Sequence, residues 1–69
     1  MIAVHVNGRR VELDGRTALL SYLEKLGVSP QAVAVELNGE ILDRSAYANA
    51  MLDDGDVVEI VRMVGGGAW

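Results

Sequence analysis

Three consecutive glycines near the carboxyl end, Gly65, Gly66 and Gly67, are the residues of this chain best suited to take part in chemistry. A glycine has no Cβ, so its backbone accepts φ of either sign and fits a channel too narrow for other residues. Three extended residues span at most roughly 10 Å, enough to reach from a docking surface into a partner's buried site. We therefore expect a flexible tail, residues 65–69, on a domain of residues 1–64; the alternative is an ordinary frayed terminus.

The rest of the chain lacks the groups that most catalytic and metal sites need. There is no cysteine, so the chain cannot hold a persulfide, form a disulfide or offer a thiolate ligand. His5 is the only histidine, and no carboxylate or nucleophile stands beside it in the sequence, so we interpret it as a surface or interface residue. The sequence predicts no metal site, no cofactor and no enzymatic activity of its own.

The charge of the chain also excludes some partners. Its formal net charge is −4, whereas nucleic-acid-binding domains usually carry a basic stripe, so we expect no nucleic-acid partner. The acidic cluster Asp53, Asp54 and Asp56 is interpreted as a turn with a solvated face. No segment approaches the roughly 20 apolar residues of a membrane span. We see no signal peptide and expect a cytoplasmic protein without a membrane partner.

Side chains alternate between apolar and polar in four segments, which predicts strands over residues 2–6, 9–13, 33–37 and 57–63. The pairs Asn7-Gly8 and Asn38-Gly39 each favour a hairpin turn, because a type I′ turn needs positive φ at both central residues. The side chains expected to face the core are Ile2, Val4, Val6, Val11, Leu13, Val33, Val35, Leu37, Val58 and Ile60.

One helix is predicted over residues 18–26, with Thr17 as its N-cap and Gly27 just beyond its end. Its expected apolar stripe consists of Leu19, Leu20, Leu23 and Leu26. Residues 44–51 are weakly helical. A mixed sheet curled around one helix, an α+β fold, is the simplest arrangement that buries every apolar set. In that arrangement the last strand lies parallel beside the first.

The outward positions of these strands define a possible docking face. Alternation places Ala3, His5, Ala34, Val61 and Met63 on the side of the sheet away from the helix. Val61 and Met63 directly precede Val64 and Gly65, where a partner must hold the chain if it takes up the glycines. The alternative is that these are ordinary exposed aliphatic residues, which are common on any protein surface.

The segment Asp54-Gly55-Asp56-Val57-Val58-Glu59-Ile60, followed by Val64-Gly65-Gly66-Gly67, resembles the ThiS and MoaD sulfur carriers, and ThiS most closely. The resemblance covers nearly the whole chain. It implies a ubiquitin-like β-grasp fold and a sulfur atom carried as a thiocarboxylate on the last glycine. By position, that role falls to Gly67, with Gly66 as the other half of the glycine pair.

The resemblance also implies partners. An E1-like adenylating enzyme of the ThiF type would activate the carboxylate with ATP. A sulfur donor such as a cysteine desulfurase would supply the sulfur. A thiazole synthase of the ThiG type would receive it for thiamin biosynthesis. The carrier would then act as a tethered substrate.

One feature departs from the family pattern, because Ala68 and Trp69 follow the glycines. Adenylation needs a free carboxylate, so we expect these residues to be a removable extension that a protease trims.

Three other functions stay open. The sulfur could serve molybdopterin, cysteine or tRNA thiolation. Gly67 could instead join a lysine of another protein, as in a ubiquitin-like modifier. The chain could also be an interaction module that never uses its terminus.

Overall fold

The computed structural model describes residues 1–63; residues 64–69 lie outside the described part, as do the predictions made for them. Its main sheet has the strand order β2-β1-β7-β4-β5. These strands are β1 (Ile2–Val6), β2 (Arg9–Leu13), β4 (Val33–Leu37), β5 (Glu40–Ile41) and β7 (Val57–Arg62). β1 and β7 pair in parallel, while the other neighbours are antiparallel. The predicted position of the last strand beside the first is confirmed.

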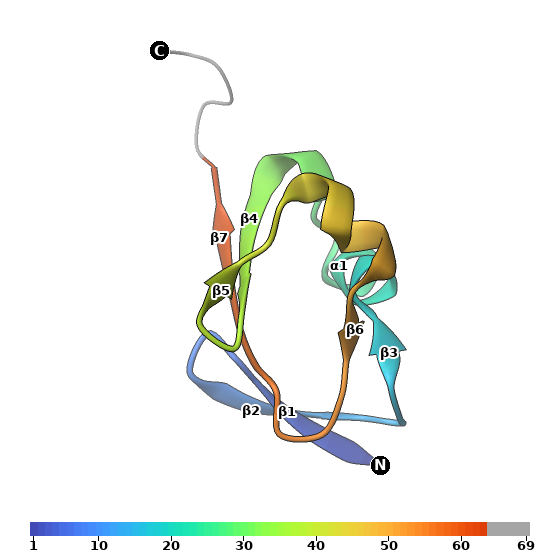
Figure 1. Ribbon diagram of the computed structural model, residues 1–69. Helices are drawn as coiled ribbons and strands as arrows, with labels where there is room; N and C mark the ends of the chain where they lie inside the picture. Colours follow the sequence, from blue (N-terminus) through green and yellow to red (C-terminus); the bar gives the residue numbers. More distant parts are fainter. Residues whose placement is uncertain (64–69) are drawn as a thin grey trace.

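The helix α1 (Leu19–Leu26) lies across from β7 and β4, and the chain curls around the space between them (Figure 1). A small second sheet pairs β3 (Thr17–Ala18) with β6 (Met51–Leu52). Residues 1–63 contain two 3₁₀ helices, η1 (Pro30–Ala32) and η2 (Arg44–Asn49), the latter in the segment predicted to be weakly helical. The predicted α+β architecture, a mixed sheet curled around one helix, is confirmed.

The start of α1 differs from the prediction that Thr17 is its N-cap. Thr17 lies in β3 and its hydroxyl donates to the Gly15 carbonyl at 2.7 Å, so it does not cap the helix. Ala18 occupies the N-cap position, and the Leu19 N–H donates instead to the Ala50 carbonyl at 3.0 Å. A backbone partner from a distant segment therefore replaces the side-chain cap. At the other end, Gly27 has a φ of 78° and closes the helix as predicted.

The buried side of α1 also differs in part from the prediction. Leu19 and Leu23 are fully buried, and Tyr22 joins them at 5% exposure. Leu20 and Leu26, which were predicted to belong to the same stripe, are exposed. Successive helical residues are about 100° apart, so Leu20 points well away from Leu19.

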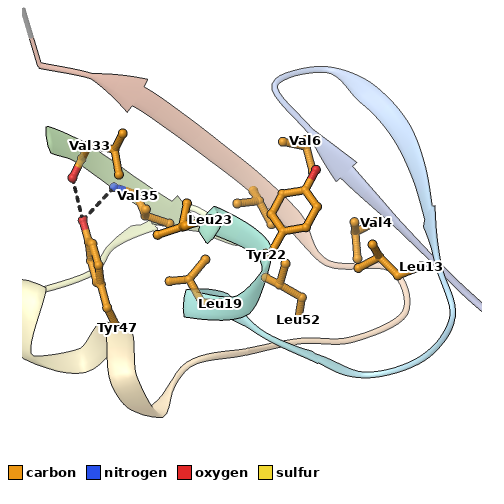
Figure 2. Packing of buried hydrophobic residues seen from close by; sticks show 11 residues of the cluster. Val4, Val6, Leu13, Leu19, Tyr22, Leu23, Val33, Val35, Tyr47 and Leu52 are labelled. Carbon is orange, nitrogen blue, oxygen red and sulfur yellow. Dashed lines mark hydrogen bonds between the residues drawn. The ribbon is translucent and has the colours of Figure 1, made fainter. Parts of the chain in front are cut away.

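One core lies between the sheet and α1 (Figure 2). The predicted inward residues are buried or packed against the core, and Tyr22, Tyr47 and Leu52 complete it. Leu52 is fully buried, although it stands in a two-residue strand that no periodicity reveals. Among residues 1–63 the core contains no buried charged residue, so apolar burial dominates its stability.

Tyr47 brings a polar group into this core without leaving it unpaired. Its hydroxyl donates to the Val33 carbonyl at 3.0 Å and accepts from the Val35 N–H at 3.2 Å (Figure 2). β5 pairs with β4 only at Glu36 and Leu37, so the hydroxyl takes the place of a strand along the first half of β4. The side chain thereby ties η2 to the sheet.

Candidate functional site

The strand that leads to the glycines, β7, is held on one side by Asn7. The side-chain carbonyl of Asn7 accepts from the Ile60 N–H at 2.8 Å, and its amide donates to the Ile60 carbonyl at 3.1 Å. The Asn7 backbone N–H also donates to the Val58 carbonyl at 2.9 Å. The asparagine thus continues the pairing between β1 and β7 beyond the last residue of β1.

Asn38 plays a similar part from the hairpin between β4 and β5. Its side-chain carbonyl accepts from the Val57 N–H at 2.8 Å, and its backbone N–H donates to the Val57 carbonyl at 2.7 Å. Its side-chain amide donates to the carboxylate of Asp56 at 3.1 Å. Both hairpin asparagines have a φ of 52°, as the turn prediction requires. Both also hold β7 in place, a second role that the Asn-Gly signal alone does not reveal.

The far end of β7 is fixed by β4. The antiparallel pairing extends to Val33 opposite Arg62, and the Met63 N–H donates to the Ala32 carbonyl at 2.8 Å. The chain is therefore part of the hydrogen-bonded framework up to Met63. In the sequence, only Val64 separates this anchored residue from Gly65.

The acidic cluster is built into the turn before β7, in agreement with its interpretation as a turn. The Asp54 carboxylate accepts from the Ala3 N–H at 2.8 Å, and the Gly55 N–H donates to the Ala3 carbonyl at 2.8 Å. The Asp56 carboxylate accepts from the Asp53 N–H at 2.8 Å, and Asp53 lies 3.7 Å from Arg16. The Asp54 carboxylate thus ties the turn to β1, whereas the Asp56 carboxylate holds the turn itself and the Asp53 carboxylate faces Arg16.

The face of the main sheet opposite α1, called here the outer face, carries the alternate residues of each strand. Cross-strand register places Val61 beside Ala34, Glu59 beside Glu36, and Val57 beside His5. On β5, Ile41 stands opposite Glu36 and is 80% exposed.

One end of the outer face, next to Met63, is apolar. We call this set the outer patch: Ala34, Ile41, Val61 and Met63. Val61 is 59% exposed and Met63 is 39% exposed, so both present apolar surface to solvent in the described part of the chain. Sequence reasoning placed three of the four on this face but left out Ile41. Its alternation was hidden, because β5 has only two residues.

Ala3 and His5 share the outer face but lie away from the outer patch. His5 pairs with Val57, which stands six residues before Met63. About 20 Å of extended strand therefore separates His5 from the end of the sheet where Met63 lies. A single partner that contacts both His5 and the outer patch must cover nearly the whole sheet. The role of Ala3 and His5 in partner binding stays a prediction. The same holds for Val64 and Gly65, which lie outside the described residues.

A hollow of about 170 Å³ opens on the outer face, lined by Ala34, Val35, Glu36, Ile41, Glu59 and Val61. A larger hollow of about 360 Å³ lies on the helix side, lined by Leu20, Ser21, Glu24, Val28 and Pro30. The smaller one is the more relevant to the glycines, because it shares Ala34, Ile41 and Val61 with the outer patch.

No group of three or more His, Cys, Asp or Glu side chains within residues 1–63 is arranged to hold a metal ion. Over the same residues, no helix has the length and apolar character needed to cross a membrane. Within residues 1–63, β7 is thus an anchored strand with exposed apolar residues near its end, and the glycine run follows it in the sequence.

The model of the ThiS family matches residues 4–67, which include all of the sheet except the first two residues of β1, the helix and all three glycines. The chain belongs to the ThiS family. It is 42% identical over 64 residues to the sulfur carrier protein ThiS of Thermus thermophilus, covering 93% of this chain and 98% of that protein.

A solved ThiS structure shares the fold. The crystal structure of the thiamine biosynthesis protein ThiS from Geobacter metallireducens superposes with a TM-score of 0.80 at 38% identity. The match covers 96% of this chain and all of the other. The ubiquitin-like β-grasp fold implied by the sequence resemblance is therefore confirmed.

ThiS-like sequence also occurs within a larger protein. This chain is 40% identical over 63 residues to a thiazole synthase of Paramagnetospirillum magneticum. Those residues are 91% of this chain but only 19% of the synthase, so the chain spans about a fifth of that relative.

Proposed function

We propose that this ThiS-family chain is a sulfur carrier that bears a thiocarboxylate on Gly67 and donates its sulfur to thiazole formation in thiamin biosynthesis. The observation that carries the proposal is the family match, which continues past the last described strand and ends at Gly67. The carrier is a co-substrate and supplies no acid, base or metal of its own. Its cytoplasmic location stays a prediction.

The chemistry requires activation, because a carboxylate repels nucleophiles. An E1-like enzyme of the ThiF type joins the Gly67 carboxylate to the AMP moiety of ATP and releases pyrophosphate. The outer sulfur of a persulfide on a donor such as a cysteine desulfurase then attacks the acyl carbon and AMP leaves, which gives an acyl disulfide. A thiol then attacks the donor's sulfur of that disulfide, so the S–S bond breaks, the thiocarboxylate is released and the thiol is oxidised to a disulfide. The carrier contributes the reach of its glycines and a surface by which the enzyme holds it.

The geometry of the described residues supports a carrier that offers a binding surface and a reactive terminus while the enzyme performs the chemistry. Hydrogen bonds fix β7 through Met63, and the outer patch surrounds the point where the strand ends. A partner that binds the outer patch therefore holds the chain two residues before the first glycine. The similarity of the chain to part of a thiazole synthase supports a synthase of the ThiG type as the acceptor.

A reactive carboxylate at Gly67 requires the Gly67–Ala68 bond to be cut, and we propose that a protease removes the residues beyond Gly67. The test incubates two versions of the chain, one ending at Trp69 and one ending at Gly67, with ATP and the ThiF-type enzyme. Only the version ending at Gly67 should release pyrophosphate. Equal activation of the uncut version would contradict both the trimming step and the position of the reactive carbon.

A further inference from the structure

The two Asn-Gly turns, called here the first turn (Asn7-Gly8) and the second turn (Asn38-Gly39), can react chemically as well as shape the chain. Glycine has no Cβ to hinder its backbone nitrogen, so this nitrogen can attack the side-chain carbonyl carbon of the preceding asparagine. The nitrogen loses its proton as the ring closes, and the side-chain amide leaves as ammonia. Water then opens the ring to aspartate, or to isoaspartate when it attacks the other carbonyl. This deamidation needs no oxidant or reductant.

In the folded chain β7 holds both asparagines in the same way. Each backbone N–H donates to a β7 carbonyl, that of Val58 for Asn7 and that of Val57 for Asn38. Each side-chain carbonyl accepts from a β7 N–H at 2.8 Å. The side chain must turn away from this N–H to reach the glycine nitrogen, so each turn must open before it reacts. The rate at each site then depends on how often its turn opens.

The two turns differ in the strands that close them. β1 and β2 pair at five positions beside the first turn, and they bury Val4 and Leu13. β4 and β5 pair at two positions beside the second turn, extended by a hydrogen bond from the Leu42 N–H to the Val35 carbonyl. β5 lies at an edge of the main sheet, and both of its residues are exposed (Figure 1). Lifting β5 exposes little new apolar surface, so the second turn opens at a lower free energy than the first.

We propose that Asn38 is a site of spontaneous deamidation in the folded protein, whereas Asn7 is protected. The two asparagines share the following glycine, a φ of 52° and the contacts with β7. They differ in the length of the hairpin that must open. This chemistry is independent of the proposed function, because it needs neither a partner nor the glycine tail.

Deamidation of Asn38 changes how the turn before β7 is held. The Asn38 amide donates to the Asp56 carboxylate at 3.1 Å, and the same carboxylate accepts from the Asp53 N–H at 2.8 Å. Converting the amide to a carboxylate removes the donor and places two like charges in contact. Asp56 directly precedes β7, so the modified chain holds the start of that strand less firmly.

The two rates can be compared within one sample of the full chain. Trypsin cleaves after lysine and arginine, which places the two turns in separate peptides, residues 1–9 and 26–44. After incubation in mildly alkaline buffer, tandem mass spectrometry gives the fraction of each asparagine that has become an acid. In the folded protein we expect Asn38 to convert about tenfold faster than Asn7, or more. In guanidinium chloride, where neither turn is formed, the two rates should be similar.

Substitutions that imitate the product test the contact with Asp56. Asn38→Asp should lower the melting temperature by about 4–8 °C, the shift that accompanies loss of one hydrogen bond in so small a domain. Asp56→Asn is the matched control and should also lower it, because one carboxylate acceptor is lost. Asn38→Asp/Asp56→Asn exchanges donor and acceptor across the contact and should restore the wild-type value.

Any of three results would overturn the assignment of Asn38. Equal or faster conversion of Asn7 in the folded protein would show that hairpin length does not set the rate. No conversion of Asn38 over a period that converts the denatured chain completely would show that the second turn does not open. A preference for Asn38 that persists in guanidinium chloride would assign the difference to neighbouring residues instead of the fold. A double variant no more stable than Asn38→Asp would overturn the part given to Asp56.

Discussion

At the scale of single residues, two polar side chains hold the last strand and a third holds its neighbour β4. Asn7 and Asn38 reach β7 from opposite neighbours, and Tyr47 completes the hydrogen bonding of β4. Each replaces backbone pairing where a strand is too short to supply it. Backbone groups that lose such partners inside a protein cost free energy comparable to a lost hydrogen bond.

Replacing Asn7 with glycine tests the first of these contacts. Glycine accepts the positive φ of this turn position, so the change removes the two side-chain hydrogen bonds to Ile60 without adding backbone strain. We expect the free energy of unfolding in a urea titration to fall by about 1–2 kcal/mol. Asn7→Asp keeps the acceptor but places a carboxylate beside the Ile60 carbonyl, so it should also destabilise. An unchanged midpoint for both variants would show that these bonds contribute nothing.

Replacing Tyr47 with phenylalanine removes only the hydroxyl. The Val33 carbonyl and the Val35 N–H then lose this partner in a buried place. The expected loss is about 1–3 kcal/mol in the free energy of unfolding, with the fold retained in a heteronuclear NMR spectrum. A variant as stable as the wild type would contradict the role given to the hydroxyl.

Tyr22 makes the stability of the fold vary with pH in the alkaline range. Burial raises the pKa of the Tyr22 hydroxyl above its ordinary value of 10.0. The folded protein then keeps this proton at pH values where the unfolded chain has lost it, so unfolding releases a proton there. The stabilisation of the folded state by the protonated Tyr22 hydroxyl is fully present below about pH 10. It is lost as the pH rises through the folded-state pKa. Tyr22→Phe should remove this part of the pH dependence in melting curves taken between pH 8 and pH 11.

At the scale of elements, β7 links stability to function because its two faces serve different purposes. Val58 is fully buried and Ile60 packs against the core, whereas Val61 and Met63, which shortly precede the glycine run in the sequence, are exposed. Changes on the outer side should therefore affect partner binding more than folding.

Val61→Asp and Met63→Asp test this separation. Each places a charge in the outer patch, where a docked partner would exclude water, and we expect the affinity for the activating enzyme to fall by about tenfold or more. Stability should change by only about 0.5 kcal/mol, as is usual for surface positions. Ala48→Asp, an exposed change on η2, is the control. Unchanged affinity for both outer-patch variants would remove this surface from the account.

Much of this arrangement follows from sequence periodicity. The four long strands, the Asn-Gly turns and the position of β7 beside β1 were predicted, because alternation and turn residues act locally. The N-cap of α1 and the short strands β3 and β6 were not predictable in the same way. They depend on partners distant in sequence, such as Ala50 for Leu19 and Leu52 for Thr17. The same limit concealed Ile41, which completes the outer patch only through its pairing with Glu36.

At the scale of the whole molecule, folding and chemistry occupy different parts of the chain. Every residue of the described core lies between Val4 and Val58, and the proposed reactive carbon belongs to Gly67. A carrier organised in this way can present a group to several partners while its domain stays unchanged.

Deleting Gly66 and Gly67 tests this division. We expect a melting temperature close to that of the full chain, together with complete loss of adenylation by the activating enzyme. Leu23→Ala is the contrasting variant, because truncation of a fully buried leucine costs about 2–5 kcal/mol. A loss of stability of that size on deleting the glycines would contradict the division.

The central claim, that Gly67 carries sulfur, is tested most directly by intact mass spectrometry of the protein isolated from its own cells during thiamin synthesis. The account predicts a species that ends at Gly67 and is heavier than the free carboxylate by the difference between one sulfur and one oxygen atom. An alkylating reagent that reacts with thiocarboxylates should label it, and the label should be absent from cells lacking the activating enzyme. A protein that retains Ala68 and Trp69 and never carries sulfur, or one joined through Gly67 to lysines of other proteins, would contradict the account.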